Sequence, residues 1–334
     1  MWKRSSALLA GLIGLGLVAW TAATSAQPSP VAAPSRTGTR FITLGTRSGP
    51  QPTVGRAQSS NVLIVNGALY IVDAGDGVTR RLTKAGIPIR DIDNIFITHP
   101  HSDHTSGLGS LLVNQYDLNR TKPVNIYGPP GTDAIFRALL GYLSVNAEIR
   151  ISDGTRTAQP AQVFFGHDVG IGAVFQDRNI KVTAAENTHF NFPPGSPGFG
   201  KYKSYSYRFE TPDRVIVFTG DTGPSDALVE LAKGADTMVS EVTSVEELQE
   251  QRIKTGQWQK LTPEEQAGFL RHMRQEHVTP DEVGKMASRA GVKSVVLTHL
   301  PATADPKDDY ARYGEQVKKQ FSGPVLIAKD LMEF

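Results

Sequence analysis

The stretch His99-Pro100-His101-Ser102-Asp103-His104 places three imidazoles and a carboxylate within six residues, directly after the apolar run at residues 94–98. Side chains two apart on extended backbone point the same way, so His99 and His101 can bind one ion. The turn through Asp103 and His104 offers two further ligands. A polar, solvated loop after a core strand is the alternative, but three of the chain's eight histidines lie here. The ligand spacing therefore predicts a metal site with room for two ions.

The composition is that of a chain with a substantial core. It has 334 residues, of which 39% are hydrophobic, enough for one large domain or two small ones. The sequence contains no cysteine. Disulfides and thiolate zinc ligands are therefore excluded, and histidine and carboxylate side chains are left to form a metal site.

The N-terminus has the pattern of a secretory signal. Lys3 and Arg4 precede an apolar run at residues 7–20, and a small-residue stretch ends at Ala26. We expect a signal peptide over residues 1–26, removal after Ala26, and a periplasmic or secreted protein without a stable membrane partner. A retained membrane anchor is the alternative, although the apolar run is shorter than the ~20 residues that cross a bilayer.

Residues 27–40 are rich in Pro, Ser, Ala and Thr, which predicts a disordered linker without chemistry of its own. Without Lys3 and Arg4 the basic residues fall from 35 to 33, which equals the 33 acidic residues. A formally neutral mature protein argues against a polyanionic partner, because strong nucleic-acid binding usually shows a basic face.

From Phe41 onward, strand-like runs alternate with helical patterns. Strands are expected at residues 41–46, 59–65, 70–75, 94–98, 124–127, 180–183, 204–209, 215–219, 237–241 and 294–298. Helices are expected at residues 78–85, 107–116 and 226–233, and residues 245–274 are polar and helix-prone. This alternation predicts an α/β layered fold in one domain over residues 41–334.

Three later strand-like runs also end in ligand-type residues, namely His189, Asp221 and His299. Any one of them alone is more often a cap or a turn residue. Their joint occurrence favours a site, because active sites in layered α/β folds collect on loops at strand ends. We expect these three ends and the His99 segment to meet.

Four segments together resemble the metallo-β-lactamase superfamily: the run from His99 to His104, Gly220-Asp221-Thr222, Leu297-Thr298-His299 and Asp73-Ala74-Gly75. Three others are similar to its ribonuclease Z and arylsulfatase branch: Leu44-Gly45-Thr46, Ser59-Ser60-Asn61 and Ile126-Tyr127-Gly128-Pro129. The resemblance implies an αββα four-layer sandwich, with metals at one edge of its two sheets.

The resemblance also implies a ligand set for two divalent ions. The first would be held by His99, His101 and His189, and the second by Asp103, His104 and His299. Asp221 would bridge the ions, and a hydroxide between them would be the attacking group. His167 competes with His189, but we expect it to be a surface turn histidine. Zinc fits these donors, and manganese or iron would be accepted by the same set.

A glutamate–histidine pair is implied by two further matches. The ribonuclease Z branch has a His-Glu-Ala-Thr segment and a later His-Ser-Thr segment, and this chain has Ser240-Glu241-Val242-Thr243 and His277-Val278-Thr279. We expect Asp103, Glu241 and His277 to be catalytic, with Glu241 favouring a protonated His277 that donates to the departing oxygen. Alternatively, His277 caps or flanks a helix that begins near Pro280. Asp73 is either a turn residue or a partner of a metal-bound imidazole.

The resemblance leaves three functions open. The leading one is hydrolysis of a phosphodiester or sulfate ester, the second is opening of a lactone or β-lactam ring, and the third is non-catalytic or redox metal binding. The signal, the neutral charge and the lack of a long basic Gly/Pro arm argue against tRNA. We therefore expect a small-molecule ester. Phe190, Phe192, Phe199 and Trp258 are candidates to line its pocket, although ordinary core and loop packing is the expected role for at least half of them. Relatives often dimerise, which leaves a homodimer as an option by analogy.

Overall fold

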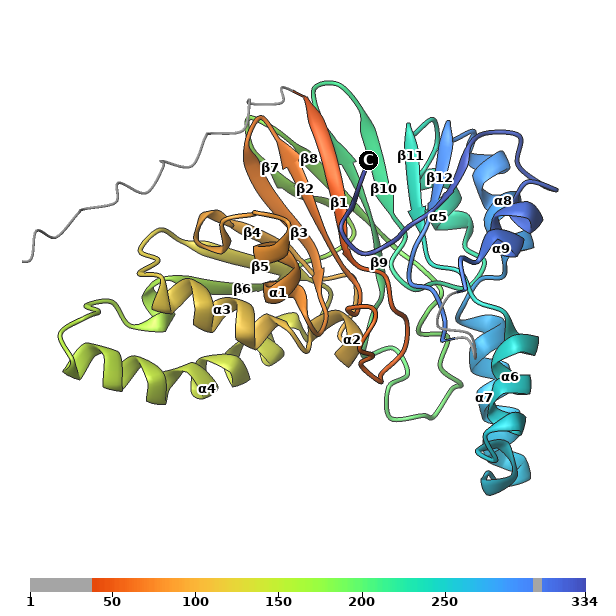
Figure 1. The fold of residues 1–334 in the computed structure, drawn as a ribbon, viewed down its shortest axis with the longest axis horizontal. Helices are drawn as coiled ribbons and strands as arrows, with labels where there is room; N and C mark the ends of the chain where they lie inside the picture. Colours follow the sequence, from red (N-terminus) through yellow and green to blue (C-terminus); the bar gives the residue numbers. More distant parts are fainter. Residues whose placement is uncertain (1–37, 303–307) are drawn as a thin grey trace, which may run out of the picture. The chain divides into compact units, whose positions relative to one another are not determined.

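Two seven-stranded β-sheets form the centre of the computed structural model, which describes residues 38–302 and 308–334. Helices cover the outer face of each sheet (Figure 1). The described residues form one compact unit. The predicted α/β four-layer sandwich is confirmed. The predicted signal peptide at residues 1–26 and residues 27–37 of the predicted linker lie outside the described residues.

The first sheet comes mainly from the N-terminal half of the chain. Its strand order is β14-β1-β2-β3-β4-β5-β6, and its last four strands run parallel. The strands are β1 (Thr39–Gly45), β2 (Ser60–Val65), β3 (Ala68–Ala74), β4 (Asn94–Phe96), β5 (Val124–Gly128), β6 (Phe164–Asp168) and β14 (Met332–Glu333).

The second sheet comes from the C-terminal half. Its order is β13-β12-β11-β10-β9-β8-β7, with parallel pairing from β10 to β13 and antiparallel pairing from β7 to β10. The strands are β7 (Gly172–Gln176), β8 (Lys181–Glu186), β9 (Tyr205–Glu210), β10 (Val215–Phe218), β11 (Thr237–Ser240), β12 (Ser294–Leu297) and β13 (Val325–Ile327).

Helices form the two outer layers. The first sheet is covered by α1 (Val78–Lys84), α3 (Leu108–Asp117) and α4 (Thr132–Ser152), and the second by α5 (Asp226–Leu231), α8 (Pro280–Ala290) and α9 (Ala311–Val317). The remaining helices are α2 (Ser102–Thr105), α6 (Val245–Lys254), α7 (Pro263–Gln275) and three 3-10 turns, Ile89–Asp91, Pro160–Gln162 and Trp258–Lys260. Within the described ranges, none of the helices combines the length and hydropathy needed to cross a bilayer.

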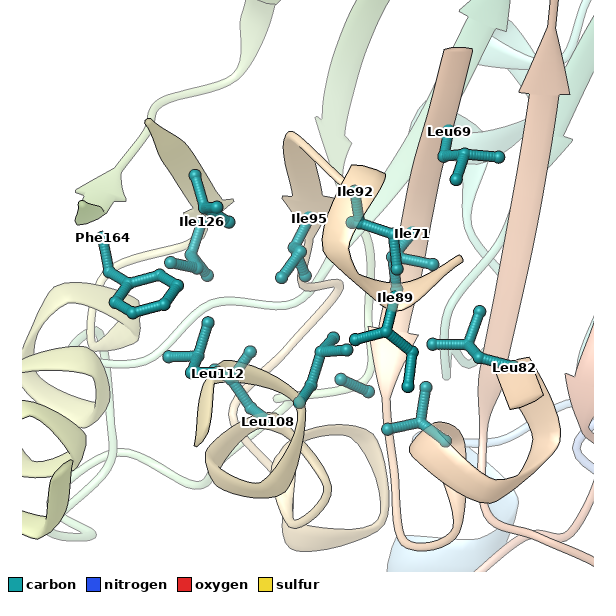
Figure 2. Packing of buried hydrophobic residues seen from close by; sticks show 14 of the residues in the cluster. Leu69, Ile71, Leu82, Ile89, Ile92, Ile95, Leu108, Leu112, Ile126 and Phe164 are labelled. Carbon is teal, nitrogen blue, oxygen red and sulfur yellow. The ribbon is translucent and has the colours of Figure 1, made fainter. Parts of the chain in front are cut away.

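Alternation along the strands creates separate cores on the two faces of each sheet. In β3, Leu69 and Ile71 face α1 and α3, whereas Tyr70 and Val72 lie between the sheets. Figure 2 shows the outer cluster, in which strand residues such as Ile71 meet helix residues such as Leu82. A one-residue slip would exchange these faces, so the alternation fixes the register.

Helices α7 and α8 begin in the same way but differ in burial. Each follows a threonine whose side chain caps the helix and which is contacted in return by a glutamate, Glu265 for α7 and Glu282 for α8. Helix α8 buries six residues and ends at Gly291, which has a φ of 64°. Helix α7 buries none. Helices α6 and α7, with the turn between them, form a hairpin that extends away from the sheets (Figure 1).

The structure differs from the sequence prediction in several elements. β1 begins at Thr39, inside the predicted linker, because Thr39 pairs with Val65 and its backbone N–H donates to Asp213. The 21-residue helix α4 was not predicted. It buries only four residues, so its apolar periodicity is weak. Strands β6 and β7 were also missed, since most of their residues are exposed or half-buried.

Candidate metal centre

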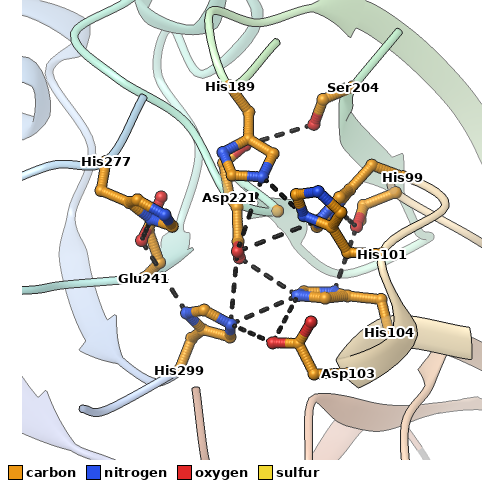
Figure 3. Close-up of polar contacts among 12 residues, drawn as sticks. His99, His101, Asp103, His104, His189, Ser204, Asp221, Glu241, His277 and His299 are labelled. Atoms are coloured by element: carbon orange, nitrogen blue, oxygen red, sulfur yellow. Dashed lines mark hydrogen bonds and ion pairs between the residues drawn. The ribbon is translucent and has the colours of Figure 1, made fainter. Parts of the chain in front are cut away.

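Five strands deliver polar residues to one edge of the sandwich. The chain continues from β4 to His99, from β8 to His189, from β10 to Asp221, from β11 to Glu241 and from β12 to His299. β10, β11 and β12 are parallel, and β8 runs in the direction of β10 because both are antiparallel to β9. Their side chains point toward one another in Figure 3.

The backbone at these strand ends adopts conformations that side chains rarely accept. Asp73 and His299 have positive φ values of 62° and 48°. Gly220 has a φ of 59°, and a Cβ at this position would lie 2.8 Å from the Cβ of Thr98. The turn before Asp221 therefore requires glycine. Such backbone conformations persist where the surrounding structure holds them, and they concentrate at functional sites.

Three histidines form the first group of possible ligands. His101 Nδ1 lies 3.1 Å from His99 Nε2 and 3.1 Å from His189 Nε2. His99 and His189 are buried, whereas His101 is exposed. The structure therefore places His189, which is 88 residues away from His101 in the chain, with the histidines of the local motif.

The second group contains Asp103, His104, Asp221 and His299, all buried. His299 Nε2 lies 3.3 Å from His104 Nε2 and 3.2 Å from Asp103 Oδ2. Oδ1 of Asp221 lies 3.2 Å from His104 Nε2, and its Oδ2 lies 3.3 Å from His299 Nε2. These donors all come within 4.8 Å of one another.

Asp221 stands between the two groups. Its Oδ2 also lies 3.9 Å from His99 Nε2 and 4.0 Å from His189 Nε2. The side chain is 3% exposed and extends from the turn after β10 into the space between the histidines (Figure 3). All seven residues that the sequence singled out as ligands are thus brought to one place, with Asp221 shared.

Outer contacts fix which ring nitrogen of two of the histidines, His104 and His189, faces the centre. His104 Nδ1 lies 2.8 Å from Asp73 Oδ2, and His189 Nδ1 lies 2.8 Å from the backbone oxygen of Glu276. Because both partners only accept hydrogen bonds, Nδ1 must carry the proton, and in the neutral ring Nε2 keeps a lone pair. Asp73 is itself held by Thr98, whose backbone N–H donates to Oδ1 at 2.8 Å.

The histidines of the centre differ in the direction in which their pKa is shifted. Burial lowers the pKa of His99 and His189 well below the usual value, and lowers the pKa of His101 as well. These rings are therefore neutral near pH 7. Burial also acts to lower the pKa of His104, but the carboxylates of Asp221, Asp73 and Asp103 outweigh it and raise that pKa well above the usual value.

The carboxylates of the centre are ionised. Burial alone would raise the pKa of Asp221, but His299 and His104 hold it well below its usual range. Burial also opposes ionisation of Asp103, and His104 and His299 again reverse the effect and lower its pKa. Two buried carboxylates side by side repel each other, and a cation between them would offset that repulsion.

The residues fit divalent metal ions. Oδ1 of Asp221 is buried and charged, and although His104 Nε2 lies 3.2 Å away, no hydrogen bond of normal geometry satisfies it. Ring nitrogens of His99, His101 and His189 face one another at 3.1 Å, and a cation among them would be bound by their lone pairs. Imidazole and carboxylate donors in groups of three and four are the set that zinc prefers. We therefore describe the site as a candidate metal centre.

Glu241 and His277 form a pair beside the centre. His277 Nδ1 lies 2.7 Å from Glu241 Oε2, and Glu241 Oε1 accepts from the backbone N–H of Thr222. The pair reaches the centre on two sides, because Glu241 Oε2 lies 3.8 Å from His299 Nδ1 and His277 belongs to a group with His189 and Asp221.

One expectation about this pair is wrong. We expected Glu241 to favour a protonated His277, but burial outweighs the neighbouring carboxylates and lowers the pKa of His277. Burial also raises the pKa of Glu241 well above its usual value, with Asp221 adding to the effect. His277 does not cap the next helix, since Thr279 is the N-cap of α8. Its ring is held by Glu241 instead.

A cleft of about 780 Å³ opens onto the centre. One wall is the α6–α7 hairpin, which contributes Leu248, Arg252, Phe269 and His272, and the other is the loop after β1, residues 47–51. His101, Asp103, Asp221, His277 and His299 form the floor. A substrate in the cleft would therefore contact both groups and the Glu241–His277 pair.

The predicted aromatic lining is largely wrong. Phe190 packs on the rings of His99 and His101, with centroids 5.6 and 5.1 Å apart, so it supports the ligands. Phe192 stacks on Phe190, and Trp258 packs on Phe269. Phe199 is 56% exposed and, like the others, is not among the residues that line the cleft.

His167 lies in β6, where its ring stacks on Tyr127 and its Nε2 contacts Asn125 at 2.9 Å. It belongs to none of the metal-binding groups found among the described residues. Sequence reasoning missed other residues of the site, notably His272, Glu276 and Arg47. Glu276 acts through its backbone oxygen, which no sequence pattern reveals, whereas Arg47 directly follows the quoted Leu44-Gly45-Thr46 segment and was available as a signal.

Comparison with known proteins identifies relatives over most of the chain. The family model described as "Beta-lactamase superfamily domain" matches residues 70–300. Ribonuclease Z of Archaeoglobus fulgidus is 29% identical over 316 residues, covering 86% of this chain and 95% of the relative. Ribonuclease Z of Mycobacterium sp. strain KMS is 31% identical over 291 residues, covering 86% of this chain and 93% of the relative.

Solved structures share the fold. The metallo-beta-lactamase fold protein YhfI from Bacillus subtilis superposes with a TM-score of 0.64 at 18% identity, covering 89% of this chain and 98% of that chain. The short form of human tRNase Z superposes with a TM-score of 0.58 at 24% identity, covering 88% of this chain and 98% of that chain.

These relatives contradict the argument against tRNA. Proteins named Ribonuclease Z align with more than four fifths of the chain, and a tRNase Z shares its fold. A neutral net charge is a poor guide here, because it averages over the whole surface. Arg47, Arg252 and Lys260 all line the cleft, so local positive charge is present where a polyanion would bind.

The predicted periplasmic or secreted location is contradicted as well. The relatives that cover 86% of this chain are named Ribonuclease Z, a name that gives no support to an exported enzyme. The pattern that suggested export lies wholly within residues 1–26, outside the described residues.

The identification from sequence motifs is confirmed. The family model spans the strands from β3 to β12, and so includes the segment after β4 and the ends of β8, β10 and β12 that form the candidate metal centre. The Mycobacterium relative extends the match to nearly its full length. The chain belongs to the beta-lactamase superfamily, in the ribonuclease Z branch of metallo-β-lactamase hydrolases.

Proposed function

We propose that this protein is a metal-dependent phosphodiesterase that cleaves RNA. The observation that carries the proposal is Asp221, a buried carboxylate at the floor of an open cleft. It belongs to the group with Asp103, His104 and His299, and its Oδ2 also lies 3.9 and 4.0 Å from His99 and His189 of the other group. Relatives named Ribonuclease Z support RNA as the substrate class. The cations that line the cleft, Arg47, Arg252 and Lys260, support an anionic substrate.

Two divalent cations in these groups, most simply zinc, would supply an activated water and offset the charge that develops on the phosphate. In each of the two groups, one imidazole is already oriented by contacts within the protein. Asp73 and the Glu276 carbonyl orient the imidazoles of His104 and His189, so little rearrangement is needed on binding.

His277 handles the proton in this proposal. Its Nδ1 is held by Glu241, and the neutral ring has a lone pair on Nε2. Nε2 accepts a proton as water oxygen attacks phosphorus, and it returns that proton to the departing oxygen when the bond between phosphorus and that oxygen breaks. Glu241 Oε2, 2.7 Å from Nδ1, holds the ring in place during both steps. Asp103 holds the adjacent loop through the Gly49 N–H at 2.9 Å.

The test is a substrate comparison with the metal-loaded protein. A chromogenic phosphodiester, a precursor RNA with a 3′ extension, an aryl sulfate and a lactone are assayed under one set of conditions, with Asp221→Ala as the control for contaminating nuclease. The proposal expects cleavage of the phosphodiester and the RNA, and loss of both in the variant. Turnover of the lactone or the sulfate alone would contradict it, as would no turnover at full metal content.

A further inference from the structure

Arg47 is a cation of the cleft whose guanidinium forms no ion pair among the described residues. It follows β1 and lines the cleft together with Asp103, Asp221 and His299. Within residues 38–302 and 308–334, no carboxylate forms an ion pair with its guanidinium, and its nearest hydrogen-bond contact is Ser48 Oγ at 3.5 Å. Its Nε is buried and has no hydrogen-bond partner. Buried polar groups are normally satisfied, so this one needs an explanation.

The backbone around Arg47 is fixed to the metal centre. Its N–H donates to the Ala57 oxygen at 2.9 Å, and the next N–H donates to the oxygen of Leu300, the residue after His299, at 3.1 Å. Gly49 lies two residues after Arg47, and its N–H donates to Asp103 Oδ2 at 2.9 Å. Arg47 is therefore held between two ligand-bearing segments.

A second anchor holds the other side of the loop. Asp330 accepts from the backbone N–H and the hydroxyl of Thr46, at 3.0 and 2.7 Å, and from the N–H of Ala57 at 2.8 Å. Asp330 is itself paired with Arg81 at 2.9 Å. The position of Arg47 is thus set by backbone contacts that do not use its guanidinium. The side chain is left free for a ligand.

We propose that Arg47 binds the phosphate group of the substrate beside the metal centre. The inference rests on the proposed phosphodiesterase function and names the residue that binds the anionic group of the substrate. A guanidinium is planar, stays charged, and offers donors in a fork that matches two phosphate oxygens. Partial burial in the cleft strengthens such a contact, because water competes less for the donors.

Arg56 offers a matched control on the same loop. It also lacks an ion pair among the described residues, and its Nη1 is buried without a partner. Its guanidinium lies over the ring of Tyr310, 4.6 Å from the centroid, and it does not line the cleft. Removing either arginine therefore takes the same charge from the same loop, but only one of the two faces the substrate.

The experiment measures binding of inorganic phosphate to the metal-loaded protein by calorimetry. Wild type is compared with Arg47→Gln, Arg47→Lys and Arg56→Gln, after metal content and melting temperature have been measured for each. Arg47→Gln should weaken phosphate binding by about 10- to 100-fold, the usual effect of losing a charged hydrogen bond. Arg47→Lys should lie between this variant and wild type, since it keeps the charge but not the fork. Arg56→Gln should bind like wild type.

Kinetics with the chromogenic phosphodiester separate the possible outcomes. Loss of Arg47 should raise KM more than it lowers kcat, with metal content unchanged. Phosphate binding in Arg47→Gln that equals wild type would overturn the assignment, and so would an equal loss in Arg56→Gln. If Arg47→Gln does not fold, Arg47→Lys with wild-type phosphate affinity would overturn it. A wild type that binds phosphate through Arg47 but cleaves no phosphodiester would instead contradict only the proposed function.

Discussion

The floor and the wall of the cleft are built in different ways. The floor holds the ligands after four strand ends and in α2, and all of them except His101 are buried. Further contacts fix some of them, such as that of Asp73 with His104. The α6–α7 hairpin that forms the wall buries only Val245. We infer that substitutions in the buried floor would disturb both the fold and the metal centre. Substitutions on the exposed hairpin should change contacts in the cleft and leave the fold intact.

Removal of Asp221 should have the largest effect. The Asp221→Ala variant loses the carboxylate shared by both groups, so both ions should bind weakly and activity should fall by at least about 1000-fold. Metal analysis and kinetics on the purified variant check this. Asp226→Ala, which removes an exposed aspartate paired with Arg289, is the control. A variant at 221 with full metal and normal rate would show that the two groups do not share this residue.

Removal of His277 should separate chemistry from metal binding. His277→Ala should keep its metal but slow turnover by about 100- to 10,000-fold, the usual range for loss of a proton-transfer group. The slowing should be greatest for phosphodiesters with poor leaving groups, because those need the proton most. His167→Ala is the matched control, since His167 lies outside the centre. Equal slowing for every leaving group would argue against proton donation by His277.

A change at Asp73 should weaken metal binding without removing a ligand. Asp73→Asn keeps the shape of the side chain but loses the charge that holds Nδ1 of His104 at 2.8 Å. We expect metal affinity to fall by about 10- to 100-fold. Competition with a chromophoric chelator measures it. Unchanged affinity would mean that His104 is oriented by other contacts.

Metal affinity should rise with pH. The raised pKa of His104 means that the metal-free protein holds a proton there, which the metal must displace. The pKa values of His99, His101 and His189 are lowered, so these rings are already neutral and release no proton. Affinity should therefore fall as pH falls, by about tenfold per unit for one displaced proton. Chelator titrations between about pH 6 and pH 8 that show a flat affinity would contradict the protonated His104.

The smallest effect is expected on the wall. Phe269 lines the cleft from α7 and lies under Arg252, whose guanidinium is 4.3 Å from the ring centroid. Phe269→Ala removes a contact worth about 0.5–1 kcal/mol, so KM should rise a few-fold while kcat and metal content stay unchanged. Steady-state kinetics and metal analysis measure this. A large loss of metal would show that the wall and the floor are coupled.

How well the sequence predicted each residue of the site depends on how far apart the residues lie in the chain. The ligands from His99 to His104 lie within six residues, so spacing alone indicated a metal. His189, Asp221 and His299 could be proposed because each follows a strand, and the resemblance put them in order. The backbone oxygen of Glu276 carries no signal in the sequence, since any residue at that position supplies the same group.

The fold was predictable where the hydrophobic pattern was strong. The buried strands β2, β3 and β12 alternate or run apolar and were found, whereas α4, with four buried residues in 21, was not. Net charge failed for another reason. It sums the whole surface and says nothing about which cations face the cleft, so it was a poor argument against tRNA.

The most direct test is anomalous X-ray diffraction from crystals of the zinc-loaded protein, measured on both sides of the zinc absorption edge. Two zinc ions are expected, one among His99, His101 and His189 and one among Asp103, His104 and His299, with Asp221 in contact with both. A single ion, or ions bound away from Asp221, would contradict the shared centre from which the proposed chemistry follows.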